Sequence, residues 1–366
     1  MTVASPQAKG GQAGATRNGV ELGRLLLEGR AFLALIAIIA AFSLLSPNYF
    51  TIPNFLTMAT HVALFGILAV GMLMVILNGG IDLSVGSTLG LAGVVAGFLM
   101  QGVTLSALGV ILYPPVWVVA VLTCALGAFV GAINGVLIAR FNVPAFVATL
   151  GVMYVARGAA LLITNGLTYN NLAGRAELGN TGFDWLGFNR LFGVPIGVVA
   201  LVVISVIGSV VLNRTAFGRW LYASGGNERA ADLSGVPVRA VKIAVYVISG
   251  VCAAIAGLIL SSQLTSAGPT AGNSYELTAI AAVVIGGAAL TGGRGNIRGT
   301  LLGAFVIGFL SDGLVIIGVS SYWQTVFTGA VIVLAVMLNA IQYRRRVKRP
   351  SSADGPTASQ PQGAKL

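Results

Sequence analysis

Long apolar runs, separated by short polar or glycine-rich breaks, dominate the middle of the chain. Each run comes close to the length that an α-helix needs to cross about 30 Å of hydrocarbon. The run at 31–45, AFLALIAIIAAFSLL, lacks the alternation of a membrane β-strand. Because backbone polar groups in lipid must be paired internally, the pattern predicts an all-α membrane protein with about ten transmembrane helices. The runs are roughly 31–46, 58–78, 84–101, 115–139, 145–165, 193–213, 241–262, 276–291, 297–318 and 321–341.

The composition fits this interpretation. Of the 366 residues, 56% are hydrophobic and 8% are charged, whereas soluble domains carry about 25% charged residues. The 50 glycines suit a protein in which small residues let membrane helices approach closely. We therefore expect a transmembrane domain over 31–343, between a disordered segment 1–30 and a basic, disordered tail 344–366.

The basic residues predict the orientation of the chain. Of the 21 Lys and Arg residues, 18 fall in segments that share one side if the ten runs alternate in direction. Arg175 and Arg190 fall on the other side, and Arg157 lies within the fifth run. Since loops rich in Lys and Arg stay in the cytoplasm, both termini and the loop 214–240 are predicted to be cytoplasmic. This bias accounts for the net charge of +11 without a nucleic-acid partner.

Residue types that carry catalysis or bind metals are scarce. The chain has one histidine, His61, and two cysteines, Cys124 and Cys252, which both lie in apolar runs. We expect no metal site, no disulfide framework and no cofactor bound by this chain. None of the four lysines lies in a GxxxxGK[ST] motif, so the sequence indicates neither an ATPase nor any other enzyme.

A charged segment at 218–237, GRWLYASGGNERAADLSGVP, is the longest between the apolar runs. It is predicted to form a turn at its two central glycines, followed by a helix of roughly two turns. Asn227 is a suitable N-cap, Glu228 favours the first turn, and Gly235 suits the C′ position. So short a helix needs a docking surface. The alternative is an ordinary cytoplasmic loop that membrane topology has made basic.

Two glycine-rich breaks interrupt the apolar runs. The first, NGGIDLSVGS at 78–87, places Asp82 at or near the membrane, where it either lines a water-filled path or caps the next helix. The second, TGGRGNIRGTLLG at 291–303, aligns with the first at an offset of 213 residues. Gly79 and Gly80 then meet Gly292 and Gly293, which indicates an internal repeat.

Several polar residues lie inside or beside the apolar runs and are candidates for a solute pathway. Each has the alternative role of helix–helix contact. The outer loop 166–191 carries aromatic and charged residues, which either receive a soluble partner or form an interfacial aromatic belt. The pathway candidates are Asn78, Asp82, Ser84, Asn134, Thr149 and Glu276, with Arg157, Gln263 and Asp312 as further buried polar positions.

Four stretches together carry a family resemblance, which spans residues 78 to about 304. The chain resembles the permease subunit of ribose-, xylose- and arabinose-type ABC importers, with a type II-like fold. The resemblance implies that 214–240 is a coupling loop whose helix docks in the ATPase subunit. The stretches are NGGIDLSVGS, GAINGVLIARFNVPAFVATLGVMYVARGAALLITNG, GRWLYASGGNERAADLSGVPV and ELTAIAAVVIGGAALTGGRGNIRGTLLGA.

Importer permeases often show a Glu-Ala-Ala, three residues, Gly pattern in the docking helix. Ala230, Ala231 and Gly235 match it, while Glu228 lies one position upstream of the Glu. We expect Ala231 to face the ATPase. The implied coupling residues are Gly226, Asn227, Glu228, Arg229, Ala230, Ala231, Asp232 and Gly235.

The resemblance also implies a set of partners in a bacterial cytoplasmic membrane. These are a second permease copy, an extracytoplasmic solute-binding protein and an ATPase with two nucleotide-binding halves, which uses ATP and Mg²⁺. The expected cargo is a sugar or similar small polar solute. The alternative is an ion-coupled secondary carrier, in which Asp82 or Glu276 would bind the ion. A docking helix discriminates between them, because a secondary carrier has no need of one.

Overall fold

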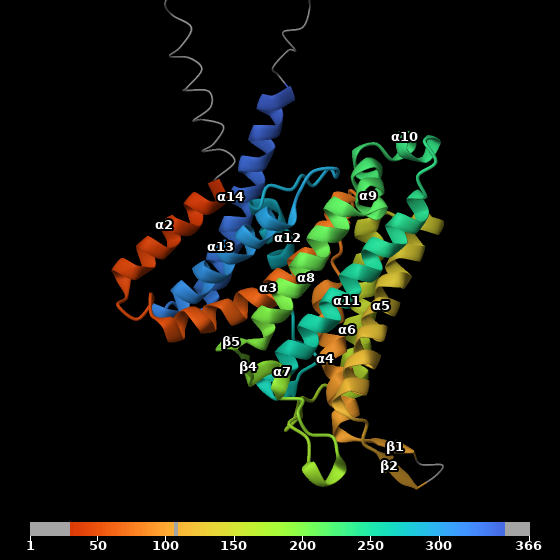
Figure 1. Ribbon diagram of the computed structural model, residues 1–366, viewed down its shortest axis with the longest axis vertical. Coiled ribbons are helices and arrows are strands. Elements are labelled where there is room, and N and C mark those ends of the chain that lie inside the picture. The colour runs from red at the N-terminus through yellow and green to blue at the C-terminus, as the bar shows by residue number, and fades with distance from the viewer. Residues whose placement is uncertain (1–29, 106–108, 348–366) are drawn as a thin grey trace, which may run out of the picture.

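The computed structural model describes residues 30–105 and 109–347. Each of the ten predicted apolar runs overlaps a helix (Figure 1). Within the described residues, α3, α5, α6, α8, α11 and α13 are long and apolar enough to cross a membrane, whereas α2, α4 and α12 are apolar but shorter. The ten helices are α2 (Arg30–Leu45), α3 (Ile52–Leu77), α4 (Val85–Gln101), α5 (Val116–Arg140), α6 (Ala145–Thr164), α8 (Ile196–Arg214), α11 (Val238–Leu264), α12 (Tyr275–Ile285), α13 (Ile297–Ile316) and α14 (Ser321–Val347).

Helix α3 forms the centre of the bundle. It packs against α8, α11, α12 and α13. Of its most apolar 18-residue stretch, 83% is buried inside the protein. Helix α11 crosses beside it and packs most extensively against α5. A Cβ on Gly127 or Gly131 of α5 would overlap backbone oxygens of α11, so these glycines allow the two backbones to approach closely.

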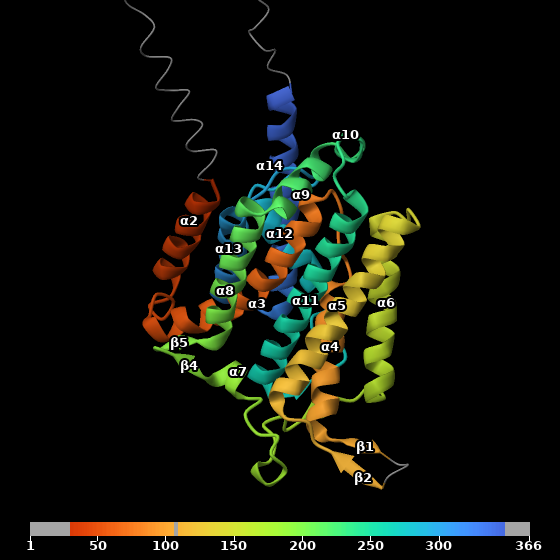
Figure 2. The same ribbon diagram turned by 45° about the vertical axis from the view of Figure 1, so that its right-hand side comes forward.

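Short elements that the all-α prediction omitted join the helices. The described part of the chain contains three two-stranded antiparallel pairs, each at most three residues long on either strand. Four of the strands, together with α7, lie at the end of the molecule opposite α10 (Figures 1 and 2). The pairs are β1 (Val103–Leu105) with β2 (Val110–Leu112), β3 (Tyr169–Asn170) with β6 (Ser266–Ala267), and β4 (Arg190–Leu191) with β5 (Val194–Pro195); η1 (Ala176–Leu178) and α7 (Trp185–Phe188) complete the set.

The start of α2 and the end of α14 lie at the same end of the molecule as α10 (Glu228–Leu233) (Figures 1 and 2). This arrangement fits the predicted topology, in which both termini share a side with the loop 214–240. Helix α2 begins at Arg30 and α14 ends at Val347. The rest of the predicted tails, 1–29 and 348–366, lies outside the described residues.

Two local predictions were wrong. The turn expected at Gly225 and Gly226 is the end of a helix, α9 (Ala216–Gly226). The eighth apolar run, predicted over 276–291, forms only the 11 residues of α12, and 286–296 is a loop. Glycine-rich sequence explains this second difference, because it favours termination of a helix over its continuation.

Candidate functional site

Helix α10 has the local structure that its sequence predicts. The Asn227 side chain caps it, since Oδ1 accepts a hydrogen bond from the Ala230 N–H at 3.0 Å. At the other end Gly235 has a φ of +81°, the left-handed conformation expected at C′. The Val236 N–H donates to the Ala231 carbonyl at 3.1 Å, which closes the C-terminus. Both ends of this six-residue helix are therefore fixed by its own neighbours.

The outward face of α10 differs from the predicted one. Ala231, which was expected to face the ATPase, is 5% exposed and faces the protein interior. Leu233 is 83% exposed, and Arg229, Ala230 and Asp232 beside it are exposed as well. The prediction missed Leu233. The sequence signal was a leucine in a charged segment, which is weak because single exposed apolar residues are common on protein surfaces.

Among the residues that the structure describes, one ion pair joins α10 to the helix bundle. Lys242 Nζ of α11 donates to Glu228 Oε1 at 2.7 Å. Glu228 therefore contacts this chain's own α11. Glu228 lies one position upstream of the Glu in the family pattern. Its ion pair with Lys242 holds α10 against α11 within the subunit.

Helix α9 meets both glycine-rich breaks, at a contact that we call the glycine junction (Gly79, Gly225, Gly226, Gly292 and Gly293). The Gly293 N–H donates to the carbonyl of Leu77 at 2.9 Å. A Cβ on Gly225 would overlap that same carbonyl oxygen, and one on Gly292 would lie 3.0 Å from the Gly79 nitrogen. The two breaks, 213 residues apart in sequence, are thus in backbone contact with each other and with the helix that leads into α10.

Two side-chain hydrogen bonds reinforce this contact. Asn78 Nδ2 donates to Ser224 Oγ at 2.9 Å and ties α9 to the first break. The Tyr222 hydroxyl donates to the Gly295 carbonyl at 2.8 Å and ties α9 to the second. Burial raises the pKa of the Tyr222 phenol, so it remains a protonated donor at neutral pH. Helix α9 is therefore tied by side-chain hydrogen bonds to both breaks.

Three of the six predicted pathway residues form one buried cluster. Asp82 is 1% exposed, and its Oδ1 accepts from the Ser84 N–H at 3.0 Å and the Ser84 hydroxyl at 2.6 Å. Its Oδ2 accepts from the Ser249 hydroxyl of α11 at 2.8 Å. Asn134 Nδ2 of α5 donates to Ser84 Oγ at 2.8 Å. The cluster thus links the first break to two neighbouring helices.

The other three predicted pathway residues lie apart. Thr149 of α6 donates to the carbonyl of Ile81 at 3.2 Å, so it contacts the backbone of the first break. Asn78 is bonded to α9, as described above. Glu276 lies in the first turn of α12, and a Cβ on Gly86 of α4 would overlap its Oε2. The structure therefore separates the predicted set into a buried cluster at the first break and a distinct position at α12.

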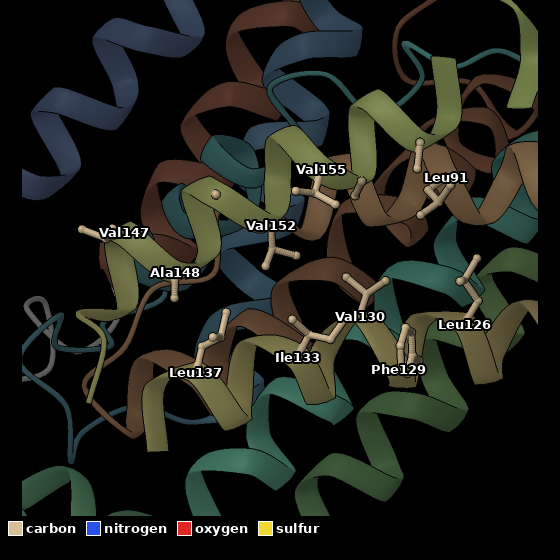
Figure 3. Close-up of a pocket in the computed structure, with 13 residues that line it drawn as sticks. Leu91, Leu126, Phe129, Val130, Ile133, Leu137, Val147, Ala148, Val152 and Val155 are labelled. Carbon is tan, nitrogen blue, oxygen red and sulfur yellow. The ribbon is translucent and has the colours of Figure 1, made fainter. Parts of the chain in front are cut away.

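An apolar groove of about 510 Å³ lies between α5 and α6. Figure 3 shows side chains of the two helices facing each other across it, among them Ile133 and Leu137 of α5 and Val152 and Val155 of α6. Its lining includes no charged or hydrogen-bonding side chain. Such a groove suits hydrocarbon and offers nothing to the hydroxyl groups of a polar solute.

Comparisons with known proteins give a consistent result. The profile of the family described as "Branched-chain amino acid transport system / permease component" matches residues 54–336. The chain is 45% identical over 315 residues to the ribose import permease protein RbsC of Escherichia coli (strain K12), covering 86% of this chain and 94% of that protein. It is 45% identical over 309 residues to RbsC of Bacillus subtilis (strain 168), with 84% and 91% covered.

A third relative is named for the transport of a different sugar, xylose. The chain is 36% identical over 367 residues to the xylose transport system permease protein XylH of Escherichia coli (strain K12), with 85% of this chain and 91% of that protein covered. No solved structure matches the chain.

Proposed function

The chain belongs to the branched-chain amino acid transport system / permease component family, and on that premise we propose that it is the membrane-spanning permease subunit of an ABC importer for a sugar or similar small polar solute. Relatives named for ribose and for xylose import match over most of their length, which supports a sugar as the solute. The membrane is the bacterial cytoplasmic membrane. A separate ATPase subunit with two nucleotide-binding halves binds ATP and Mg²⁺ and hydrolyses the ATP.

The observation that carries this proposal is the outward face of α10. Leu233 projects from a capped helix that the chain holds in place through Ala231 and through the ion pair of Glu228 with Lys242. An exposed apolar side chain flanked by Arg229 and Asp232 is suited to a protein cleft, with Leu233 as the buried anchor. An ion-coupled carrier has no need of such a surface.

The glycine junction supplies a route from that surface into the membrane. In our proposal the ATPase moves α10, and α9 moves with it because the two helices are consecutive. The contacts of α9 with Leu77 and Gly293 then shift the ends of both glycine-rich breaks. Backbone-to-backbone contacts suit this role, since they leave no side-chain freedom to absorb the motion.

Further partners complete the proposed importer. A solute-binding protein would dock at the end opposite α10, where Trp185, Phe188 and Phe192 are exposed beside the short strands. A second copy of this chain would complete the pathway. The aromatic side chains of the outer loop also suit the membrane interface, so we assign the docking role to the loop as a whole.

The docking proposal is tested by the variant Leu233→Asp, with Leu233→Met as the matched control. We expect Leu233→Asp to abolish ATPase co-purification and uptake of labelled ribose and xylose, because it places a charge in an apolar contact. Leu233→Met keeps an apolar side chain of similar volume and should retain both. Leu233 is exposed, so neither change should alter membrane insertion. Normal uptake by Leu233→Asp would refute docking through α10.

Two further variants separate docking from the integrity of α10. Gly235→Pro is incompatible with the positive φ, and Ala231→Arg forces a long side chain into a buried position. Both should abolish uptake by disrupting α10 itself. The docking contact is attributed to Leu233 only if Leu233→Asp loses transport while proteolysis in the 214–240 loop stays as in the wild type.

The proposed orientation has its own test. Reporter fusions after Lys242 and Arg298 should report the cytoplasm, as should one after Arg345. Fusions near Asn180 and Ser320 should report the outside. The reason is the distribution of Lys and Arg between the two sides. An outside signal at Lys242 would overturn the orientation and place α10 away from any cytoplasmic ATPase.

A further inference from the structure

Helix α12 is too short to cross a membrane by itself. Its 11 residues extend about 16 Å, roughly half of the 30 Å hydrocarbon thickness. Residues 268–274, between β6 and α12, are outside any helix. Non-helical backbone at membrane depth is tolerated only where it is buried in protein or lines a water-filled cavity.

Arg157 holds this non-helical segment in place. Its Nη1 donates to the carbonyl of Pro269 at 2.5 Å and to that of Ala271 at 2.9 Å. Arg157 lies seven positions before Thr164, the last residue of α6, and so about 10 Å inside the end of that helix. An arginine at this depth is costly unless it is paired, and here it satisfies carbonyls that have no helical partner.

A glycine face on α4 brings Arg157 close to Glu276. A Cβ on Gly90 would lie 2.6 Å from the Ala271 carbonyl and 3.0 Å from Arg157 Nη1. One turn earlier on the same face, a Cβ on Gly86 would overlap Glu276 Oε2. The two opposite charges therefore lie over α4 positions that are about 6 Å apart along the helix axis.

Between Ala271, which Arg157 binds, and Glu276, the chain exposes polar residues. Asn273 and Ser274 are exposed, and Glu276 is half-buried. Ser274 has a φ of +65° and immediately precedes α12. Exposed amide and hydroxyl groups at this depth lose their hydrogen bonds if they face hydrocarbon, and are satisfied if they face water.

We infer that residues 273–276 line the translocation path and that Arg157 is a positioning residue, which holds the segment 268–272 inside the membrane so that Asn273 and Glu276 face the solute. This inference rests on the proposed import function. The opposite charges of Arg157 and Glu276 balance, so the position suits an uncharged solute rich in hydroxyl groups. The carboxylate accepts and the Asn273 amide both donates and accepts, as hydroxyl recognition requires.

The first experiment measures water access. Asn273→Cys is introduced where Cys124 and Cys252 have been replaced by alanine, and the assembled importer is treated with a charged, membrane-impermeant thiol reagent. The control is Val203→Cys on α8, where the native side chain is 50% exposed on a transmembrane helix. We expect Asn273→Cys to react, ribose delivered with its binding protein to slow the reaction, and Val203→Cys to stay unlabelled. Equal, slow labelling of both would overturn the inference.

The second experiment tests Arg157. Arg157→Gln should lower the maximal rate of uptake about tenfold or more and change the labelling rate of Asn273→Cys, because charge-assisted hydrogen bonds to two carbonyls are lost. Arg157→Lys should restore part of both, since it keeps the charge and the donors. If Arg157→Gln fails to assemble, Glu276→Gln, which leaves the carbonyl contacts intact, should still raise the KM. Unchanged uptake in Arg157→Gln, or an unchanged KM in Glu276→Gln, would overturn the inference.

Different results would refute the sugar import function and the inferred position of the path. If the wild-type importer takes up neither ribose nor xylose, the proposed sugar import fails. If the wild type transports and Asn273→Cys is inert throughout turnover, only the position of the path is wrong.

Discussion

The two glycine-rich breaks share a sequence pattern and a position in the fold, yet they are held in different ways. Each follows a helix that runs toward the α10 end and precedes one that runs back (Figure 1). At the first break, Asp82 and Ser84 are buried and bonded to each other and to neighbouring helices. At the second, Arg294 and Arg298 are exposed.

This difference indicates different roles for the two halves of the molecule. Side-chain hydrogen bonds to α5 and α11 fix the first break within the core. The second break is held largely through backbone contacts at the glycine junction and follows the half-length helix α12. We interpret the first break as the more firmly held of the two, and the second as the one that α9 displaces further.

The largest effect is expected where both breaks meet. Gly225→Ala places a methyl group against the Leu77 carbonyl and 2.8 Å from the Gly293 nitrogen. Overpacking against backbone should lower the free energy of unfolding by about 1–3 kcal/mol and abolish uptake. Gly226→Ala is the matched control, because Gly226 contributes only backbone to the junction and its own Cβ would meet nothing within 4 Å. Thermal unfolding in detergent and uptake measure both variants, and equal behaviour of the two would contradict the junction.

A change confined to the first break should have the next largest effect. Asp82→Asn replaces one of the two carboxylate oxygens with an NH₂ group, which cannot accept a hydrogen bond. The bond that is lost comes either from the Ser249 hydroxyl or from Ser84. We expect a loss of about 1–3 kcal/mol in stability together with reduced uptake. Ser249→Ala removes a single donor and should cost less. Reduced uptake with an unchanged unfolding temperature would instead assign Asp82 to the pathway alone.

The second break is probed through its own backbone. Gly292 has a φ of +89° and lies against Gly225 and Gly79, whereas Gly287 has a φ of +92° with open space around its Cβ position. Gly287→Ala should cost only the strain of a left-handed conformation, about 1–2 kcal/mol. Gly292→Ala adds a steric clash and should also slow transport. If both variants lower transport equally, strain in the loop matters and the junction contact does not.

The smallest effects are expected from the two side-chain ties of α9. Tyr222→Phe removes the hydrogen bond to the second break, and Ser224→Ala removes the one to the first. Each should cost about 0.5–1.5 kcal/mol in stability. If α9 displaces the second break further, Tyr222→Phe should lower uptake at a given ATPase rate more than Ser224→Ala does. The reverse order would exchange the roles of the breaks.

The local features of the chain were predictable because they depend on neighbouring residues. The ten apolar runs predicted where helices lie, although only six of the described helices are long and apolar enough to cross a membrane, and Asn227 and Gly235 predicted both ends of α10. In each case the deciding physics is short-range: hydrophobic run length, a capping side chain, and a glycine with a positive φ. The similarity of the two breaks could also be recognised from the sequence, because Gly79 and Gly80 align with Gly292 and Gly293.

Which residues meet, and which face of a helix is buried, was decided only by the tertiary structure. The sequence assigned Ala231 to the outside and overlooked Leu233, and it did not place Arg157 against Pro269 and Ala271. In a soluble protein, a contrast between polar and apolar positions marks the buried face of each helix. Lipid is as apolar as the interior of a helix bundle, so the hydrophobic pattern that predicts a membrane helix carries almost no information about its neighbours.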